Sequence, residues 1–116
     1  MTRDKLFLLP PGFVDAALDD GGKGWICPAC AMVEGFLGIF PQVREQLEVV
    51  YVPFQRPRAP VVELIGESRQ GLPVLVLAGP SDADGVETLN GHAFISDEKA
   101  ILRYLAARHG VAAPHP

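Results

Sequence analysis

The tetrapeptide Cys27-Pro28-Ala29-Cys30 contains both cysteines of the chain and opens an apolar stretch with helical spacing. The apolar side chains after it recur at i, i+3, i+4 and i+7, on one face of a predicted helix: Val33, Phe36, Leu37 and Phe40. A proline is well suited to the first helical position, where its missing amide costs nothing. A thiol at the start of a helix meets unpaired amides and the positive end of the helix dipole, which favour the thiolate. The sequence therefore predicts thiol chemistry at the beginning of this helix.

Length and composition predict one soluble domain over residues 1–116. The apolar fraction of 48% and the charged fraction of 21% are ordinary for a globular protein. The net charge is -4 and the ten basic residues are scattered, which argues against nucleic acid as a partner. No run approaches the roughly 20 apolar residues of a membrane span, and the N-terminal residues do not form a signal sequence. We therefore expect a cytoplasmic protein, in which a close cysteine pair is more often catalytic, redox-sensing or metal-binding than structural.

Proline and glycine divide the rest of the chain into short elements. Four apolar or β-branched runs predict strands at residues 5–9, 47–53, 73–78 and 92–95. Helices are expected from Pro28 to near Phe40, from Pro60 to Gly71, and from an N-cap at Ser96 to a stop at Gly110.

The predicted order is β-α-β-α-β-β-α. Strands joined through helices are expected to lie parallel, and a hairpin across the turn-rich residues 79–91 adds an antiparallel edge. The fold class is therefore α/β, with a four-stranded mixed sheet and helices on both faces.

This order, with Cys-Pro-x-Cys at the start of the first helix and a proline at the start of the third strand, resembles the thioredoxin superfamily over nearly the whole chain. The proline directly after Cys27 is similar to glutaredoxins, and residues 94–105 resemble the end of the N-terminal domain of glutathione transferases. The closing Arg-His-Gly and Pro-His-Pro patterns resemble an uncharacterised bacterial family of thioredoxin-like proteins of unknown function.

The resemblance implies roles for particular residues. Cys27 matches the exposed nucleophile, and Cys30 matches the resolving thiol that attacks a mixed disulfide. Pro73 matches the cis-proline of the superfamily, so the bond from Leu72 to Pro73 is predicted to be cis, with the Leu72 backbone pairing with an extended peptide or glutathione.

Three further positions bear on substrate binding. Trp25 lies near the motif, where an aromatic ring covers the substrate sulfur or simply packs. Ser96 corresponds to the serine with which glutathione transferases hold the γ-glutamyl group. The 17 residues from Pro10 to Ile26 intervene between the first strand and the motif, where they could shield or widen the site.

The first functional hypothesis is a glutaredoxin-like thiol–disulfide oxidoreductase with glutathione or a protein disulfide as substrate and no bound cofactor. The second is a thioredoxin-fold binding module without turnover. The third is a zinc-stabilised interaction domain, which needs two ligands beyond the cysteines, with His92 as a candidate, although no metal site is predicted outright.

The sequence leaves two alternative roles open for three arginines. Arg56, Arg58 and Arg69 either hold a substrate carboxylate or are solvated surface charges. His109 is expected to be a cation at the end of the last helix. The exposed sheet edge and the first helix are candidate surfaces for a homodimer.

Overall fold

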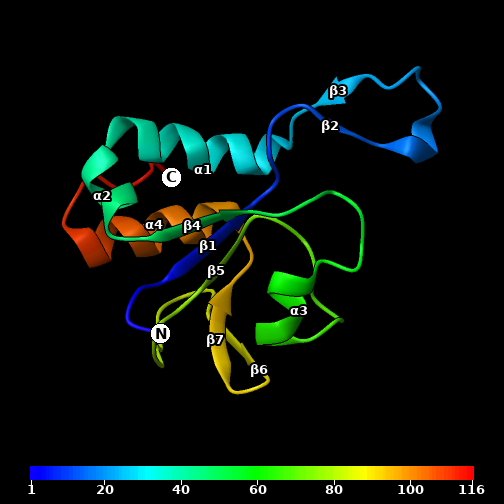
Figure 1. Cartoon of the computed structure of the whole chain (residues 1–116). Coiled ribbons are helices and arrows are strands. Elements are labelled where there is room, and N and C mark those ends of the chain that lie inside the picture. The colour runs from blue at the N-terminus through cyan, green and yellow to red at the C-terminus, as the bar shows by residue number, and fades with distance from the viewer.

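A five-stranded mixed sheet in the order β4-β1-β5-β7-β6 forms the centre of the computed structural model, which describes residues 1–116 (Figure 1). Its strands are β1 (Lys5–Leu8), β4 (Glu48–Tyr51), β5 (Val74–Val76), β6 (Glu87–Leu89) and β7 (His92–Ile95). Strand β1 pairs in parallel with β4 and antiparallel with β5. Strand β7 pairs antiparallel with both β5 and β6. The chain is thus an α/β protein with a mixed sheet, as the sequence predicts.

Helices cover both faces of this sheet, which confirms the expected layers (Figure 1). The helices are α1 (Pro28–Ile39), α2 (Pro41–Glu45), α3 (Ala59–Ile65) and α4 (Glu98–His109). Helices α1 and α4 pack on one face and contact each other, whereas α3 packs on the other face.

The strands have the period-2 alternation that a sheet covered on both faces requires. Leu6 and Leu8 of β1 belong to the cluster under α1 and α4, whereas Phe7 belongs to the cluster under α3. In β5, Leu75 packs on the α1 side and Val74 on the α3 side. Every residue of β5 is buried, which is why this strand appears in the sequence as a continuous apolar run.

The segment from Pro10 to Ile26 forms a small hairpin that projects from the body of the molecule (Figure 1). It contains β2 (Phe13–Val14), a 3₁₀ turn η1 (Ala16–Leu18) and β3 (Gly24–Trp25). At its base the Gly12 amide donates to the Trp25 carbonyl at 2.8 Å. The Phe13 ring stacks on Phe54, with 4.7 Å between ring centroids. The segment that we expected to be a loop is therefore ordered and has one aromatic contact with the body.

The expected number of strands in the sheet is wrong, because the main sheet has five strands and not four. The additional strand is β6, which lies at the edge and has mostly exposed side chains. Its sequence Glu-Thr-Leu has no apolar run, so no hydrophobic pattern marks it. It forms because Asn90 and Gly91 take positive φ angles of 52° and 76°, which suits a tight hairpin turn into β7.

The expected direction of the third strand is also wrong, because β5 runs antiparallel to β1. A parallel arrangement would require the connection after β4 to carry the chain back along the full strand. Helix α3 has only seven residues, about 10 Å of rise. The chain instead enters β5 from the end of the sheet at which β4 leaves it.

Two helix boundaries differ from those expected. Asp97 is the N-cap of α4 and accepts from the Ala100 amide at 2.9 Å, so Ser96 is not the cap. Helix α3 stops at Gly66, whose φ is 86°, and not at Gly71. Gly110 ends α4 in the left-handed conformation, as predicted. No helix has both the length and the apolar character needed to cross a membrane.

Candidate functional site at Cys27 and Cys30

Cys27 is the N-cap residue of α1, with Pro28 at the first helical position. Its backbone is extended, with φ -82° and ψ 116°, and its Sγ atom accepts a hydrogen bond from the Cys30 amide at 3.1 Å. One orphan amide of the first turn is thus satisfied by sulfur, where serine or aspartate oxygen usually serves. Cys27 is half-buried and free. An amide that donates to sulfur at a helix N-terminus stabilises negative charge on that sulfur.

The chain segment opposite Cys27 is the turn before β5. The Leu72–Pro73 peptide bond is cis, which confirms the prediction from the sequence. The Leu72 carbonyl lies 3.8 Å from Cys27 Sγ and accepts from the thiol. A second cis bond, between Arg56 and Pro57, was not predicted. The structure therefore brings three of the predicted site residues, Cys27, Leu72 and Pro73, to one place.

Cys30 lies one helical turn inside and is only 3% exposed. Burial raises the pKa of the Cys30 thiol to about 12, and the hydrogen bond and charge of Cys27 act in the same direction. The negative charge of Glu34 also raises this pKa, whereas a backbone hydrogen bond from Leu9 lowers it. At neutral pH, Cys30 is therefore a protonated thiol beside a more accessible Cys27.

Both cysteines contribute to the lining of a cleft of about 240 Å³. The cleft is mostly apolar. The residues that line it are Leu9, Pro11, Ile26, Cys27, Cys30, Ala31 and Glu34. Glu34 is the one carboxylate in the cleft. It accepts from Arg44 at 2.9 Å and from the Tyr51 hydroxyl at 2.7 Å. Its spacing of i+4 from Cys30 on a predicted helix was a signal that our sequence reasoning missed.

Trp25 is close to the cysteines in sequence, but its side chain is engaged within the hairpin. The indole Nε1 donates to Asp20 at 2.9 Å, and the Lys23 ammonium lies 4.5 Å from the ring centroid. The structure therefore gives Trp25 partners in its own hairpin and none among the other predicted site residues.

Ser96 follows β7, which pairs antiparallel with β5, so Ser96 lies at the same end of the sheet as Pro73. Its hydroxyl accepts from Arg69 at 3.3 Å. Both terminal nitrogens of Arg69 also donate to the Glu87 carboxylate, so this guanidinium already has an anionic partner.

No histidine comes together with the two cysteines to form a possible metal site. His92 begins β7, at the opposite end of the sheet from Leu72. No group of three His, Cys, Asp or Glu side chains comes together that could hold a metal ion. His109 differs from the expected cation: burial lowers its pKa, the Arg108 charge adds to this, and its buried Nε2 has no hydrogen-bond partner.

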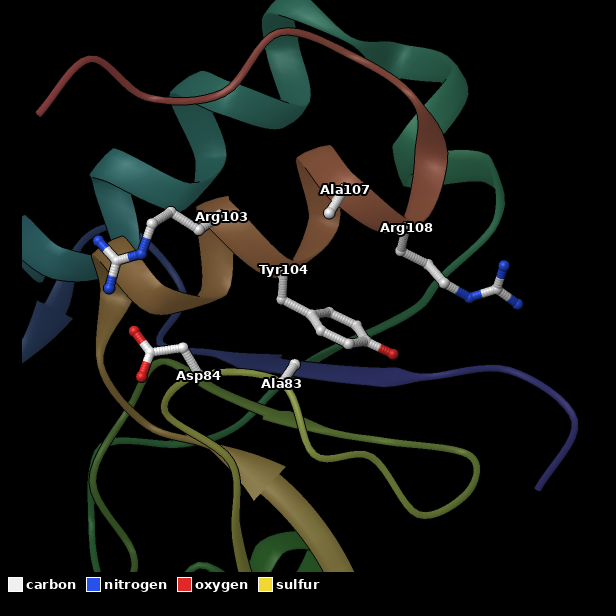
Figure 2. Close-up of a pocket in the computed structure, with 6 residues that line it drawn as sticks. All are labelled: Ala83, Asp84, Arg103, Tyr104, Ala107 and Arg108. Carbon is white, nitrogen blue, oxygen red and sulfur yellow. The ribbon is translucent and has the colours of Figure 1, made fainter.

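A second hollow, of about 430 Å³, lies between α4 and the loop at Ala83 and Asp84. Figure 2 shows the Tyr104 ring in this hollow, with Arg103 and Arg108 on either side of it along the helix. Burial raises the pKa of Tyr104, and the nearby Asp4 carboxylate adds to this effect. None of the predicted site residues lines this hollow.

Comparison with protein families finds a match over nearly the whole chain. Residues 3–113 match the model of a family described as "Protein of unknown function (DUF3088)". Comparisons with curated proteins and with solved structures find no match.

Proposed function

The chain belongs to the DUF3088 family, and from this premise we propose that it is a thioredoxin-fold thiol–disulfide oxidoreductase acting on glutathione or a protein disulfide. One observation carries the proposal: the Cys27 sulfur accepts the Cys30 amide at the start of α1, while the second thiol is buried one turn away. Two thiols so placed have unequal access to substrate, as an attacking and a resolving thiol require.

The order of the elements supports the thioredoxin fold. Four consecutive strands of the sheet lie in the order β4-β1-β5-β7, with α1 and α4 on one face and α3 on the other. The cysteines begin α1 and face the Leu72–Pro73 turn. In this proposal β6 and the β2–β3 hairpin are additions to that frame.

In the first chemical step, the Cys27 thiolate attacks one sulfur of the substrate disulfide. A bond forms between Cys27 Sγ and that sulfur, the substrate S–S bond breaks, and the other sulfur leaves as a thiolate that takes a proton from solvent. The product is a mixed disulfide on Cys27. The apolar cleft and the Leu72 carbonyl face the position at which the substrate sulfur arrives.

In the second step, Cys30 loses its proton and attacks Cys27 Sγ. The Cys27–Cys30 disulfide forms, and the bound sulfur leaves as a second thiolate. With glutathione disulfide as substrate, two electrons pass from the protein to glutathione and two glutathione thiols result. Because its raised pKa keeps Cys30 protonated, we expect this step to accelerate with pH. Two glutathione thiols or another dithiol regenerate the reduced protein.

For the substrate-binding residues, we propose that the backbone at Leu72 and Pro73 pairs with an extended peptide or glutathione, with Ser96 nearby at the same end of the sheet. Trp25 would have to leave Asp20 to cover the substrate sulfur. The proposal includes action in the cytoplasm, where glutathione keeps thiols reduced.

The test is equilibration of the purified protein in glutathione redox buffers, followed by alkylation and intact-mass analysis. We expect a reversible Cys27–Cys30 disulfide with a potential in the range of roughly -200 to -270 mV. Cys27→Ser abolishes exchange, and Cys30→Ser traps a glutathione adduct on Cys27. Thiols that stay reduced and unmodified in every buffer contradict the proposal.

A binding module without turnover is the second candidate, because the outer face of α1 contributes to an apolar groove of about 550 Å³. Exposed Met32 and Ile39 lie in it, together with Leu102 of α4. This function predicts that Cys30→Ser leaves partner binding unchanged. The zinc-domain hypothesis has less support, since no third ligand joins the cysteines.

A further inference from the structure

Arg58 precedes α3 and is only 6% exposed, which is unusual for an arginine. Its guanidinium is held by backbone carbonyls. Nε and Nη2 donate to the Phe54 carbonyl at 3.1 and 2.6 Å, and Nη1 donates to the Gln70 carbonyl at 2.8 Å. The guanidinium carbon also lies 5.4 Å from the Phe54 ring centroid. Arg58 is therefore fixed in one position by carbonyls from two chain segments, one four residues before it and one twelve residues after it.

No carboxylate compensates the charge of Arg58. The ion pairs of the molecule join Lys5 to Glu48, Arg44 to Glu34 and Arg69 to Glu87. Carbonyl oxygens satisfy N–H groups but bring no negative charge, and a buried charge is costly unless an opposite charge is near. Burial is accordingly the main cause that lowers the pKa of Arg58, and the neighbouring Arg56 lowers it further.

The groups of opposite sign that act on Arg58 are the cysteine sulfurs in their ionised form. Their charges raise the pKa of Arg58, against the effect of burial. Because Cys30 is protonated at neutral pH, the charge that matters there is the one on Cys27. Arg58 and Cys27 also bind the same short chain segment. The Gln70 carbonyl accepts from Arg58, and two residues later the Leu72 carbonyl accepts from the Cys27 thiol. Phe54, Leu72 and Cys27 also pack against the same core cluster. Glu34, the carboxylate near Cys30, is occupied by Arg44 and Tyr51.

We propose that Arg58 is a positioning residue for the cysteine site: a buried cation, held by the Phe54 and Gln70 carbonyls, that stabilises negative charge on Cys27. This inference rests on the proposed function and adds a control of redox poise to it. When the disulfide forms, two thiols lose two electrons to the substrate disulfide, and their two protons end on its two product thiols. Arg58 then faces no negative charge. The cation therefore stabilises the reduced form and makes the Cys27–Cys30 disulfide more oxidising.

The test compares two substitutions that lose the same paired hydrogen bonds but differ in charge, Arg58→Lys and Arg58→Gln. Both are made in a Cys30→Ala background, so that alkylation by the uncharged reagent iodoacetamide reports Cys27 alone. Rates are measured from pH 5 to pH 9. Arg56→Gln is the matched control, because it removes the same charge from an exposed position two residues away.

We expect Arg58→Gln to slow alkylation at pH 7 by about tenfold and to move the pH profile upward by about one unit, the low end of what an opposite charge near a titrating group produces. Arg58→Lys stays within about threefold of the parent, and Arg56→Gln within about twofold. In the protein with both cysteines, Arg58→Gln should shift the equilibrium between dithiol and disulfide about tenfold toward the disulfide. This corresponds to a reduction potential lower by about 30 mV.

Equal losses in the Lys and Gln variants, with unshifted pH profiles, would overturn the inference and leave Arg58 a structural residue. If circular dichroism shows that the Arg58→Gln variant does not fold, the Arg58→Lys variant still tests the inference. A tenfold slower alkylation of Cys27 in this variant, which keeps the charge, contradicts the inference. An alkylation rate close to that of the parent supports it. Alkylation requires no disulfide exchange, so a protein inactive in glutathione buffers refutes the proposed function without affecting this measurement.

Discussion

Ionisation of Cys30 should destabilise the reduced protein at high pH, and Cys30→Ala should remove that effect. Cys30 is buried in the cluster between α1, α4 and the sheet. Its pKa is about 12 in the folded protein, against an ordinary value of 9.0. Because the folded-state pKa is the higher one, the stabilisation is complete below pH 9 and is lost as pH rises toward 12.

The magnitude follows from the separation of the two pKa values. Between pH 9 and 12 the unfolded chain releases the proton and the folded protein keeps it, so the free energy of unfolding falls by about 1.4 kcal/mol per pH unit. The complete loss, reached above pH 12, is about 4 kcal/mol, and more than half of it has occurred by pH 11. This is a large part of the 5–15 kcal/mol by which domains are usually stable.

The assay is urea denaturation at intervals from pH 8 to pH 11 with a phosphine reductant, for the wild-type protein and for Cys30→Ala. Lysines and tyrosines also titrate in this range, but they are common to both proteins. The difference between the two unfolding free energies therefore isolates Cys30. A difference that stays constant from pH 8 to pH 11 would refute the reasoning, since Cys30 would then ionise equally in the folded and unfolded states.

Three other predictions concern stability. Burial of His109 lowers its pKa, so the unfolded chain binds its proton first and stability should fall as pH drops below about 6.5; His109→Gln should reduce this loss in urea denaturation at pH 7.5 and pH 5. Leu37→Ala, at a side chain only 1% exposed, should cost about 2–5 kcal/mol, whereas Ile39→Ala, at a 71% exposed side chain, should change stability by less than about 0.5 kcal/mol. Asp97→Ala should cost about 1 kcal/mol by thermal denaturation, and Ser96→Ala should cost clearly less, because Asp97 is the cap; the reverse order would contradict this assignment.

The parts of the fold that sequence predicts are those with a local cause. The start of α1 at Pro28 and the stop of α4 at Gly110 depend on the conformations that proline and glycine allow. The buried strand β5 is a continuous apolar run. Its antiparallel direction was not predictable, because direction depends on the path of the whole connection after β4. Strand β6 has no hydrophobic pattern and depends on the turn at Asn90 and Gly91.

The candidate site divides in the same way. Cys27 and Cys30 follow from a short motif, whereas the cis bond between Leu72 and Pro73 was implied by the resemblance to the thioredoxin superfamily. Sequence analysis names Arg58 only as a candidate for holding a substrate carboxylate or as a solvated surface charge, and its burial could not be predicted, because Arg56-Pro57-Arg58-Ala59-Pro60 has the composition of an exposed connector. Its burial depends on carbonyls at Phe54 and Gln70, whose positions are set by tertiary packing and not by residue type.

The β2–β3 hairpin is closed at its base by the bond between the Gly12 amide and the Trp25 carbonyl. Since the chain leaves the body and returns to it at neighbouring points, the twelve residues between them form a module with its own internal bonds. Shortening this module to a tight turn, or exchanging it for another hairpin, would leave the path from β1 to Cys27 intact, at the cost of the stacking between Phe13 and Phe54. During evolution the length and charge of this hairpin can therefore change independently of the sheet. In an engineered protein, a recognition peptide could replace the hairpin only two residues before Cys27.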